Sequence, residues 1–325
     1  MEFVGSYLNL QNRIDRRLSS LFRKTYPATL YEPIRYALSQ KGKRVRPILL
    51  IFSCGAIGGN IKDCFDAALA VEILHNFTLV HDDIMDNDLY RRGMKTVHAK
   101  WDESVALLCG DGLIALAYRS LLKSNEKYIK RITSIFSEGI VKVCEGQSLD
   151  KDFEEMKEVG IDEYIFMIEK KTGVLMSISA EIGCILGGGT EEDIQSMRLY
   201  GMQLGVAFQI QDDLLDIISH KKVLGKQIGS DLVLGKKTYP ILLLNMRVSK
   251  KEKNNFMDIM KRKRIRKSDI EYIKELLDKY EIISYIRGEV HRRINLAKRY
   301  ISALNNVSCS ENLIELADMI DNREY

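Results

Sequence analysis

Apolar residues recur along this chain at steps of three and four positions, the spacing that lines one face of an α-helix. A clear example is the series Ile270, Ile273, Leu276, Leu277 and Tyr280. Sustained alternation of Val, Ile and Thr with polar residues, which would indicate strands, is absent. Only four prolines interrupt the 325 residues, so long helices can form. The pattern therefore predicts an all-α protein.

Three segments are apolar nearly all the way round a helix, namely 64–80, 104–118 and 201–215. A helix of that kind is buried on every side, so we expect these segments to be central helices surrounded by others. With 46% hydrophobic residues the chain can build one large core, and no Pro-, Gly- or Ser-rich linker divides it. We therefore expect a single domain over residues 1–325.

Two acidic clusters of the form D-D-x-x-D stand in this apolar background. They consist of Asp82, Asp83 and Asp86, and of Asp212, Asp213 and Asp216. Residues four apart share a helix face, so the first and last carboxylate of each cluster point the same way. Bare carboxylates are costly in apolar surroundings, and two patches are tolerable if they face each other across a cleft that holds divalent cations. Oxygen ligands favour Mg²⁺, bound together with substrate phosphates.

A single cluster of this kind is more often a solvated, acidic helix end, and it is the second copy that argues for metal binding. An EF-hand is excluded, because a loop starting at Asp86 would place Arg91 where that loop requires Gly.

Short segments that combine Gly or Thr with Lys or Arg surround both clusters. They are 42–47, 88–93, 170–173, 225–231 and 235–238. Such segments bind phosphate through side-chain charge and backbone N–H groups, although each taken singly is more often a surface turn. Together with the acidic clusters they predict a site for two metal-bridged diphosphates.

In these motifs and their order, the sequence resembles the trans-isoprenyl diphosphate synthases, which are head-to-tail prenyltransferases. The resemblance covers roughly residues 35–300 and rests on G-K-R-V-R-P at 42–47, D-D-I-M-D at 82–86, R-R-G at 91–93, F-Q-I-Q-D-D-L-L-D at 208–216 and G-K-K-T-Y-P at 235–240. It implies an orthogonal helical bundle around a central catalytic cavity, the isoprenoid synthase fold.

The resemblance implies condensation of isopentenyl diphosphate with an allylic diphosphate, which can be dimethylallyl, geranyl or farnesyl diphosphate. The steps would be ionisation of the allylic substrate, attack by the isopentenyl double bond, and loss of a proton to the released diphosphate. Three Mg²⁺ ions are expected in each active site, with Mn²⁺ as a substitute. The family is also typically homodimeric.

The resemblance further implies roles for individual residues. The metal ligands would be Asp82, Asp83, Asp86, Asp212, Asp213 and Asp216. The allylic diphosphate would be bound by Arg91, Lys171, Thr172, Gln209, Lys226 and Lys236. Isopentenyl diphosphate would be bound by Gly42, Lys43, Arg46, His75 and Arg92. The catalytic residues would be Asp82, Asp86, Asp212, Lys171, Lys226 and Arg91.

Some of these positions also have a purely structural interpretation. A lone histidine in an apolar helix, such as His75, is by default a buried packing residue, but the family pattern favours a diphosphate contact. His81 is expected to orient the first acidic cluster. Gly110, Gln147 and Asp150 match family positions, and helix packing explains them equally well.

Product length is predicted from the helix that precedes Asp82. Phe77 lies about 7.5 Å up that helix, and periodicity alone makes it an ordinary core residue. The segment 75–86, however, resembles archaeal-type geranylgeranyl diphosphate synthases. We therefore predict Phe77 as the floor of the product tunnel, with small Thr78 above it. Ile73 and Leu74 would lie below it. The predicted main product is the C20 diphosphate, with farnesyl diphosphate or diphosphates of C25 and longer as alternatives.

Three other classes of protein fit these motifs less well. A terpene cyclase normally replaces the second D-D-x-x-D, and a head-to-head synthase is disfavoured for the same reason. An inactive regulatory subunit should lack metal ligands that this chain retains.

The rest of the composition bears on partners and location. The net charge of +4 is unremarkable, and the basic run 261–267 lacks aromatic residues, so we expect a solvated loop and no nucleic acid. Weak attraction to an anionic membrane surface remains open. No membrane span or signal peptide is predicted. The six cysteines have no C-x-x-C spacing and are expected to be buried thiols in a reducing compartment, the cytoplasm.

Overall fold

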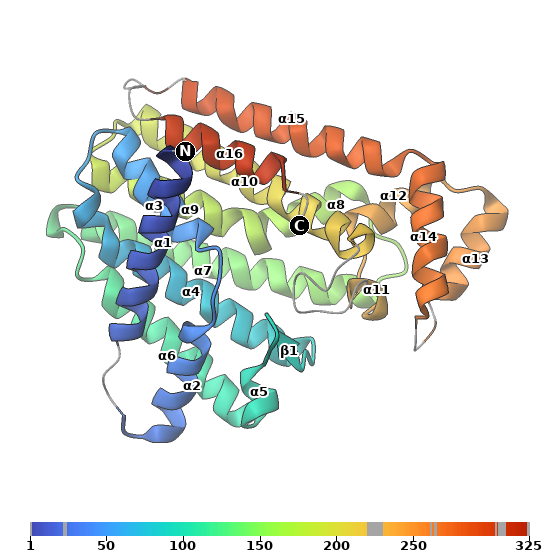
Figure 1. The fold of residues 1–325 in the computed structure, drawn as a ribbon, viewed down its shortest axis with the longest axis horizontal. Coiled ribbons are helices and arrows are strands. Elements are labelled where there is room, and N and C mark those ends of the chain that lie inside the picture. The colour runs from blue at the N-terminus through green and yellow to red at the C-terminus, as the bar shows by residue number, and fades with distance from the viewer. Residues whose placement is uncertain are drawn as a thin grey trace.

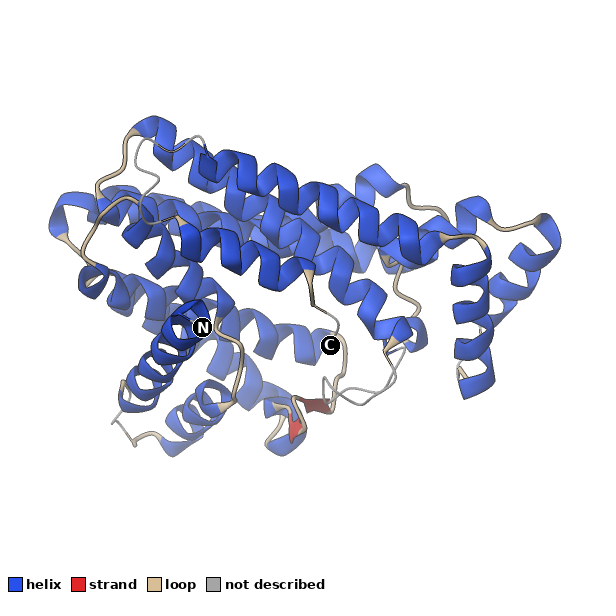
Figure 2. Ribbon diagram, turned by 45° about the horizontal axis from the view of Figure 1, so that its top comes forward, coloured by secondary structure: helices blue, strands red, loops and turns tan. Residues whose placement is uncertain are grey.

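The computed structural model describes residues 2–21, 25–219, 230–260, 262, 265–302, 304 and 310–323. In these residues the regular structure is almost entirely helical, as the ribbon in Figure 2 shows. A single two-stranded antiparallel sheet is described, in which Tyr90 lies opposite Lys95 and Arg91 opposite Met94. The all-α prediction is confirmed.

The described helices and strands occur in the following order along the chain. The first half contains α1 (Glu2–Ser20), α2 (Ala28–Ser39), α3 (Val45–Ala56), η1 (Ile61–Cys64), α4 (Phe65–Met85), β1 (Tyr90–Arg91), β2 (Met94–Lys95), α5 (Val97–Lys100), α6 (Glu103–Leu121) and α7 (Glu126–Glu155). The second half contains α8 (Ile161–Ile168), η2 (Glu169–Gly173), α9 (Val174–Gly187), α10 (Glu191–Ile218), α11 (Ser230–Val233), α12 (Tyr239–Arg247), α13 (Lys250–Met260), α14 (Lys267–Lys279), α15 (Ile282–Ser302) and α16 (Glu311–Asp321).

The bundle is built around α3, α4, α9 and α10. Figure 1 shows α4, α7, α9 and α10 across the middle of the molecule, with α15 and α16 on one side and α2, α5 and α6 on the other. Helices α13 and α14 form a hairpin at one end. In α3 and α9 nearly every side chain is buried, so these two helices belong to the innermost part of the core.

Two local features fix the helices that carry the acidic clusters and the predicted phosphate ligands. Thr190 and Asp193 form a capping box that begins α10. Between α8 and α9, the segment η2 is a turn of π-helix, and it contains Lys171 and Thr172. Single π-helical turns of this kind are frequent at functional sites. A β-carbon on Gly146 of α7 would lie 2.3 Å from the backbone nitrogen of Lys171, so only glycine allows α7 to approach this turn.

The prediction that 104–118 is a central helix is wrong. Helix α6 buries one face against α4, but Leu107 and Leu108 on its other face are 49% and 57% exposed.

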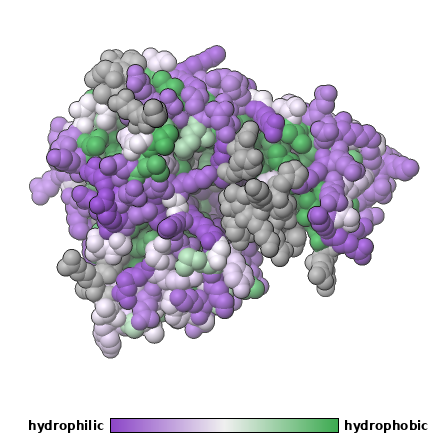
Figure 3. All heavy atoms as spheres, viewed as in Figure 1, coloured by the Kyte–Doolittle hydropathy of each residue, from purple (hydrophilic) through white to green (hydrophobic). Residues whose placement is uncertain are grey.

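By length and composition α6 could cross a membrane, although 44% of its apolar window is buried inside the bundle. A core helix passes the same test, so this is weak evidence for a span. The face of the molecule in Figure 3 is mostly hydrophilic, with hydrophobic residues in separate small patches.

Candidate functional site

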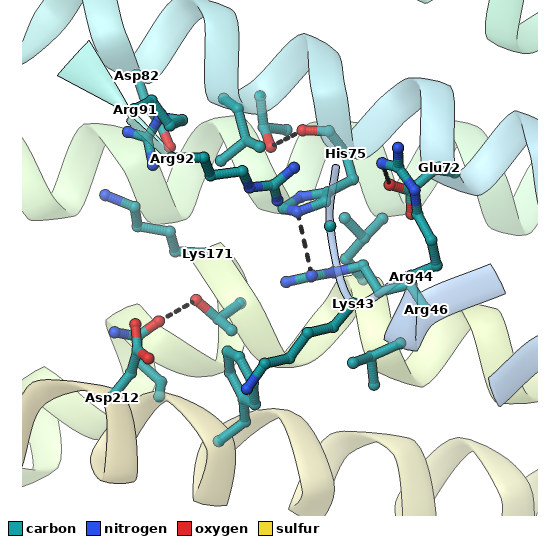
Figure 4. Close-up of a pocket in the computed structure, with 18 of the residues that line it drawn as sticks. Lys43, Arg44, Arg46, Glu72, His75, Asp82, Arg91, Arg92, Lys171 and Asp212 are labelled. Atoms are coloured by element: carbon teal, nitrogen blue, oxygen red, sulfur yellow. Dashed lines mark hydrogen bonds and ion pairs between the residues drawn. The ribbon is translucent and has the colours of Figure 1, made fainter. Parts of the chain in front are cut away.

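A cavity of about 820 Å³ opens between α4 and α10. Its wall combines α1, the loop before α3, α4, β1, η2 and α10 with Asp231 and Arg323 from later in the chain. Figure 4 shows Asp82 on one side of this space and Asp212 on the other, with Lys171, Arg92 and Arg46 projecting between them. The two acidic clusters, far apart in sequence, therefore face each other across one cavity.

In each cluster, some carboxylates line the cavity and others are buried against the surrounding protein. Asp82, Asp212 and Asp216 line the cavity. Asp83 instead accepts a hydrogen bond from Arg91 Nε at 2.5 Å and is almost fully buried. Asp213 is likewise buried and turned away from the cavity. The spacing of the motif explains this, because the second aspartate lies on a different helix face from the first.

Asp213 anchors α10 to its neighbours. It accepts hydrogen bonds from the hydroxyl of Tyr164, from Gln209 Nε2 at 2.8 Å and from the backbone N–H of Tyr239 at 3.1 Å. Burial, together with Asp231, raises the pKa of Asp213 to about 7. The carboxyl is thus held in a network that fixes the start of α12 beside the site.

Asp86, the last residue of the first cluster, is paired with two lysines. Its two carboxylate oxygens lie 2.7 Å from Lys151 Nζ and 2.7 Å from Lys236 Nζ. Although burial works in the opposite direction, Lys236 and Lys151 hold the pKa of Asp86 below its usual range. Burial raises the pKa of Asp82, by contrast, and Lys171 and Arg91 oppose that effect.

The predicted isopentenyl diphosphate ligands gather at the other end of the cavity. Gly42, Lys43, Arg46, His75 and Arg92 all line it. Arg46 Nη1 lies 3.3 Å from His75 Nε2. Burial, followed by repulsion from Arg46 and Arg92, lowers the pKa of His75 well below its usual value, so the imidazole is neutral at pH 7. A β-carbon on Gly42 would lie 2.8 Å from Arg92 Nη1, so glycine makes room for that guanidinium.

Two of these cationic side chains have N–H donors that make no hydrogen bond within the described part of the chain. Among the described residues, Arg46 Nε and Arg92 Nη1 are buried donors without a hydrogen-bond partner. Burial lowers the pKa of Arg46 to about 10, which leaves the side chain charged at pH 7. Buried unpaired donors cost free energy, and an anion entering between them would supply the missing acceptors.

The predicted allylic ligands lie around η2 and the acidic clusters. Lys171 lines the cavity and pairs with Asp150 at 2.5 Å. Thr172 donates to Gln209 Oε1 at 2.9 Å, and both residues line the cavity. Arg91 lines it too. Lys226 lies outside the described residues.

The arrangement fits divalent cations that also need ligands from the substrate. In the described part of the chain, no group of three or more His, Cys, Asp or Glu side chains converges closely enough to hold a metal ion by itself. Asp212 Oδ1 is buried without a hydrogen bond, and its ion-pair partner is Arg323 Nη2 at 2.9 Å. Carboxylate oxygens on both walls, one of them without a hydrogen bond, suit ions that bridge to a diphosphate.

The predicted chain-length residues lie on α4. Thr78 lines the cavity, whereas Ile73 and Leu74 are fully buried. Phe77 is 7% exposed, and its ring packs edge-on against His81, with 4.7 Å between ring centroids. His81 in turn lies against Gly110 of α6, where a β-carbon would be 2.0 Å from its Nε2. Gly110 therefore has a packing role.

The structure adds three charged residues that sequence reasoning missed. Arg323 follows α16 and stacks over Phe208, with 4.6 Å from its Cζ to the ring centroid. Lys151 pairs with the first cluster, and the backbone N–H of Asp231 donates to Asp216 at 3.2 Å. Asp231 ends the recognised segment 225–231 and Lys151 follows Asp150, but neither was assigned a role, and nothing in the sequence near Arg323 indicates its position.

Comparison with known proteins agrees with this geometry. The model of the polyprenyl synthetase family matches residues 27–277. The chain is 37% identical to geranylgeranyl diphosphate synthase of Methanosarcina mazei, over 100% of this chain and 99% of that protein. It superimposes on geranylgeranyl pyrophosphate synthetase from Pyrococcus horikoshii with a TM-score of 0.92, at 35% identity and full coverage of both chains.

A second solved structure is similar in fold and was determined with ligands. Polyprenyl synthase from Caulobacter crescentus, complexed with calcium and isoprenyl diphosphate, has a TM-score of 0.89 and 25% identity, with 100% of this chain and 97% of that chain covered. The family uses divalent metal ions with diphosphate substrates. From the match over most of its length, the chain belongs to the polyprenyl synthetase family of trans-isoprenyl diphosphate synthases.

Proposed function

We propose that this enzyme condenses isopentenyl diphosphate with dimethylallyl, geranyl and farnesyl diphosphates and releases mainly geranylgeranyl diphosphate. The observation that carries the proposal is one cavity in which residues of the two acidic clusters face each other at one end and Arg46, His75 and Arg92 gather at the other. One diphosphate would lie at the acidic, metal-binding end. The other would lie against Arg46, His75 and Arg92 at the basic end.

The basic end binds and orients isopentenyl diphosphate. Arg46 and Arg92 offer buried, unpaired N–H donors, which suit bidentate contacts to phosphate oxygens. Neutral His75 can donate one further N–H. Held in this way, the substrate directs its double bond toward the allylic carbon.

The acidic end promotes departure of the allylic diphosphate. Arg91, Lys171 and Lys236 carry positive charge toward the leaving group, and Lys226 is assigned the same role by sequence alone. We propose Mg²⁺ as the metal, held by Asp82, Asp86 and Asp212 with support from Asp83, Asp213 and Asp216. Bound cations would supply further positive charge that stabilises the departing diphosphate.

The reaction balances without a protein base. The C–O bond to the allylic diphosphate breaks, a C–C bond forms to the isopentenyl double bond, and one proton leaves the adjacent carbon. The released diphosphate remains beside Lys171 and can accept that proton. Basic side chains therefore serve here to hold anions.

Two properties of the whole protein belong to the same proposal. We propose a homodimer, supported by the exposed leucines Leu107 and Leu108 on α6. We also propose a cytoplasmic location. Cys54, Cys64, Cys109 and Cys184 are buried free thiols, which suits a reducing compartment, while Cys144 is exposed.

The test is incubation of the purified protein with radiolabelled isopentenyl diphosphate, Mg²⁺ and each of the three allylic primers. Acid-labile allylic products with C20 as the longest abundant species are expected. Release of a cyclic hydrocarbon, or no incorporation with any primer, would overturn the prenyltransferase assignment. A dominant C15 or C25 product would overturn only the assigned chain length, which an identity of 37% does not determine.

A further inference from the structure

The loop that carries the first predicted isopentenyl diphosphate ligands has an unusual backbone. Residues 40–44 connect α2 to α3 without helical structure. Arg44, the last of them, has φ 53° and ψ 34°, which is a left-handed conformation that a residue with a β-carbon rarely adopts. Gly42, Lys43 and Arg44 all line the cavity. Such a loop needs contacts that hold its shape.

Two side chains of α1 bind its carbonyl groups. The hydroxyl of Tyr7 donates to the carbonyl oxygen of Lys43 at 2.6 Å, and Gln11 Nε2 donates to that of Gly42 at 2.8 Å. In a planar trans peptide the N–H points opposite to the C=O. Both peptide groups therefore turn their N–H away from α1. Successive N–H groups in a turn, beside side-chain cations, form an anion-binding concavity.

A third side chain of α1 holds Arg44 itself. Asp15 Oδ1 accepts from Arg44 Nε at 2.8 Å, four residues after Gln11 and on the same helix face. The guanidinium also donates to Glu72 Oε1 at 2.6 Å and to the carbonyl of Gln40 at 2.7 Å. Arg44 is 4% exposed. With these three acceptors, the side chain is engaged in holding the loop and not in binding a ligand.

Helix α1 is itself firmly placed. Its residues Leu10, Ile14 and Leu18 are at most 4% exposed and belong to the main core. The polar face with Tyr7, Gln11 and Asp15 is therefore presented to the loop from a fixed support.

We propose that Tyr7, Gln11 and Asp15 are positioning residues for the isopentenyl diphosphate subsite. They hold residues 42–44 in an anion-binding conformation before the substrate arrives, so that binding does not have to order the loop. This inference rests on the proposed function, because it assigns a substrate to the loop.

The test uses Tyr7→Phe, Gln11→Met and the double variant, which remove the two hydrogen bonds at nearly constant volume. Each lost bond should raise the KM for isopentenyl diphosphate roughly three- to tenfold. The KM for farnesyl diphosphate and kcat should stay within about twofold of wild type, because only one substrate loses binding. Asn12→Ala, an exposed neighbour on α1, is the matched control and should leave both KM values unchanged.

Calorimetric titration with isopentenyl diphosphate alone should show the same weakening. Equal changes in both KM values, or no change in either with wild-type turnover intact, would overturn the role of α1. Absence of turnover in the wild type would instead sink the proposed function, so the two failures are distinguishable. If the double variant loses helical circular dichroism, the two KM values of Tyr7→Phe alone decide the question.

Discussion

Opposite charges are distributed unevenly around the cavity. At the acidic end, Asp86 already has Lys151 and Lys236 as partners, and Asp212 has Arg323. At the basic end, Arg46 and Arg92 keep buried donors without partners. The acidic end is therefore ready to exchange its internal counter-ions for metal and diphosphate, while the basic end requires only an anion.

Removing one cavity-facing carboxylate should abolish most turnover. We expect Asp82→Ala and Asp212→Ala each to lower kcat by about 100-fold or more, the usual loss for comparable electrostatic stabilisation. Folding should be nearly unaffected, since both side chains are partly exposed. Steady-state kinetics and thermal denaturation check this. Asp278→Ala, an exposed aspartate of α14, is the control, and activity within about threefold of wild type in both site variants contradicts the two-cluster account.

The sequence alone predicted many of the residues that line the cavity, but not that Asp83, Asp86 and Asp213 would lie outside this lining and be engaged by other residues of the protein. Repetition of D-D-x-x-D and its four-residue spacing indicated that Asp82 and Asp212 share a metal site. Nothing local to either cluster indicates Arg323 or Lys151 as partners. Lys151 is 65 residues from Asp86, and Arg323 is still farther from Asp212, so only the packing of whole helices brings these pairs together.

At the scale of elements, α4 bears both Asp82 and the residues that we predict to set product length. Near the C-terminal end of α4, Asp82 and Thr78 line the cavity. Phe77 turns toward His81, which fits against Gly110 of α6. Space gained at Phe77 would therefore open between α4 and α6.

Shortening Phe77 should lengthen the product. Phe77→Ala removes an aromatic ring from the predicted tunnel floor, and the vacated volume can hold a further isoprene unit. Chromatography of the dephosphorylated products should show a shift beyond C20. Phe65→Ala, a buried phenylalanine at the start of α4, should cost stability without lengthening the product. A folded, active Phe77→Ala enzyme with an unchanged product distribution would remove Phe77 as the floor.

The hairpin of α13 and α14 contains a carboxylate, Glu252, from which we predict how acid changes the stability of the folded protein. Lys279, Ser249 and Tyr280 bind the carboxylate of Glu252 and lower its pKa from 4.5 to about 2. The folded state then binds the proton less tightly than the unfolded state, so the contribution to stability is complete above pH 4.5 and is lost toward pH 2.

Urea unfolding of wild type and Glu252→Gln at several pH values measures this contribution. The wild type should be the more stable protein near pH 6, and the difference in unfolding free energy should shrink as the pH falls below 4.5. Glu275→Gln, an exposed substitution on α14, is the control variant. A difference between wild type and Glu252→Gln that is constant with pH would mean that the pKa is not lowered.

Helices could be predicted from the sequence where a single apolar face determines which side is buried. They were harder to predict where contact with another chain or an irregular backbone determines the structure. The periodicity at Ile273, Leu276 and Leu277 correctly indicated α14 and its buried face. The π-turn η2 has no signature in hydrophobic spacing. For α6, apolar residues all round the helix predicted burial on every side, but only the face against α4 is buried.

At the scale of the molecule, we predict that the uncovered face of α6 packs against a second copy of the chain. Leu107 and Leu108 lie side by side on it, and exposed apolar patches of this kind commonly mark protein interfaces. Because α6 also packs on α4, such an interface would lie behind the helix that bears Phe77.

A charge on this face should separate the subunits. We expect wild type to elute as a dimer, and Leu108→Glu to elute largely as a monomer because a buried unpaired carboxylate is costly at an interface. Light scattering coupled to size exclusion gives the masses. Leu8→Glu, at a leucine of α1 that is 50% exposed, should stay dimeric. A monomeric wild type, or a Leu108→Glu protein of unchanged mass, would refute this interface.

The central claim is that one cavity holds two diphosphates in different ways, one through metal and one through protein cations alone. Calorimetric titration of wild type with isopentenyl diphosphate and with the unreactive analogue farnesyl thiodiphosphate, each with Mg²⁺ and with a chelator, tests it directly. Isopentenyl diphosphate should bind with or without Mg²⁺, the analogue should bind only with Mg²⁺, and saturation with one should leave a site for the other. Competition between the two for a single site, or equal binding of the analogue in chelator, would contradict the account.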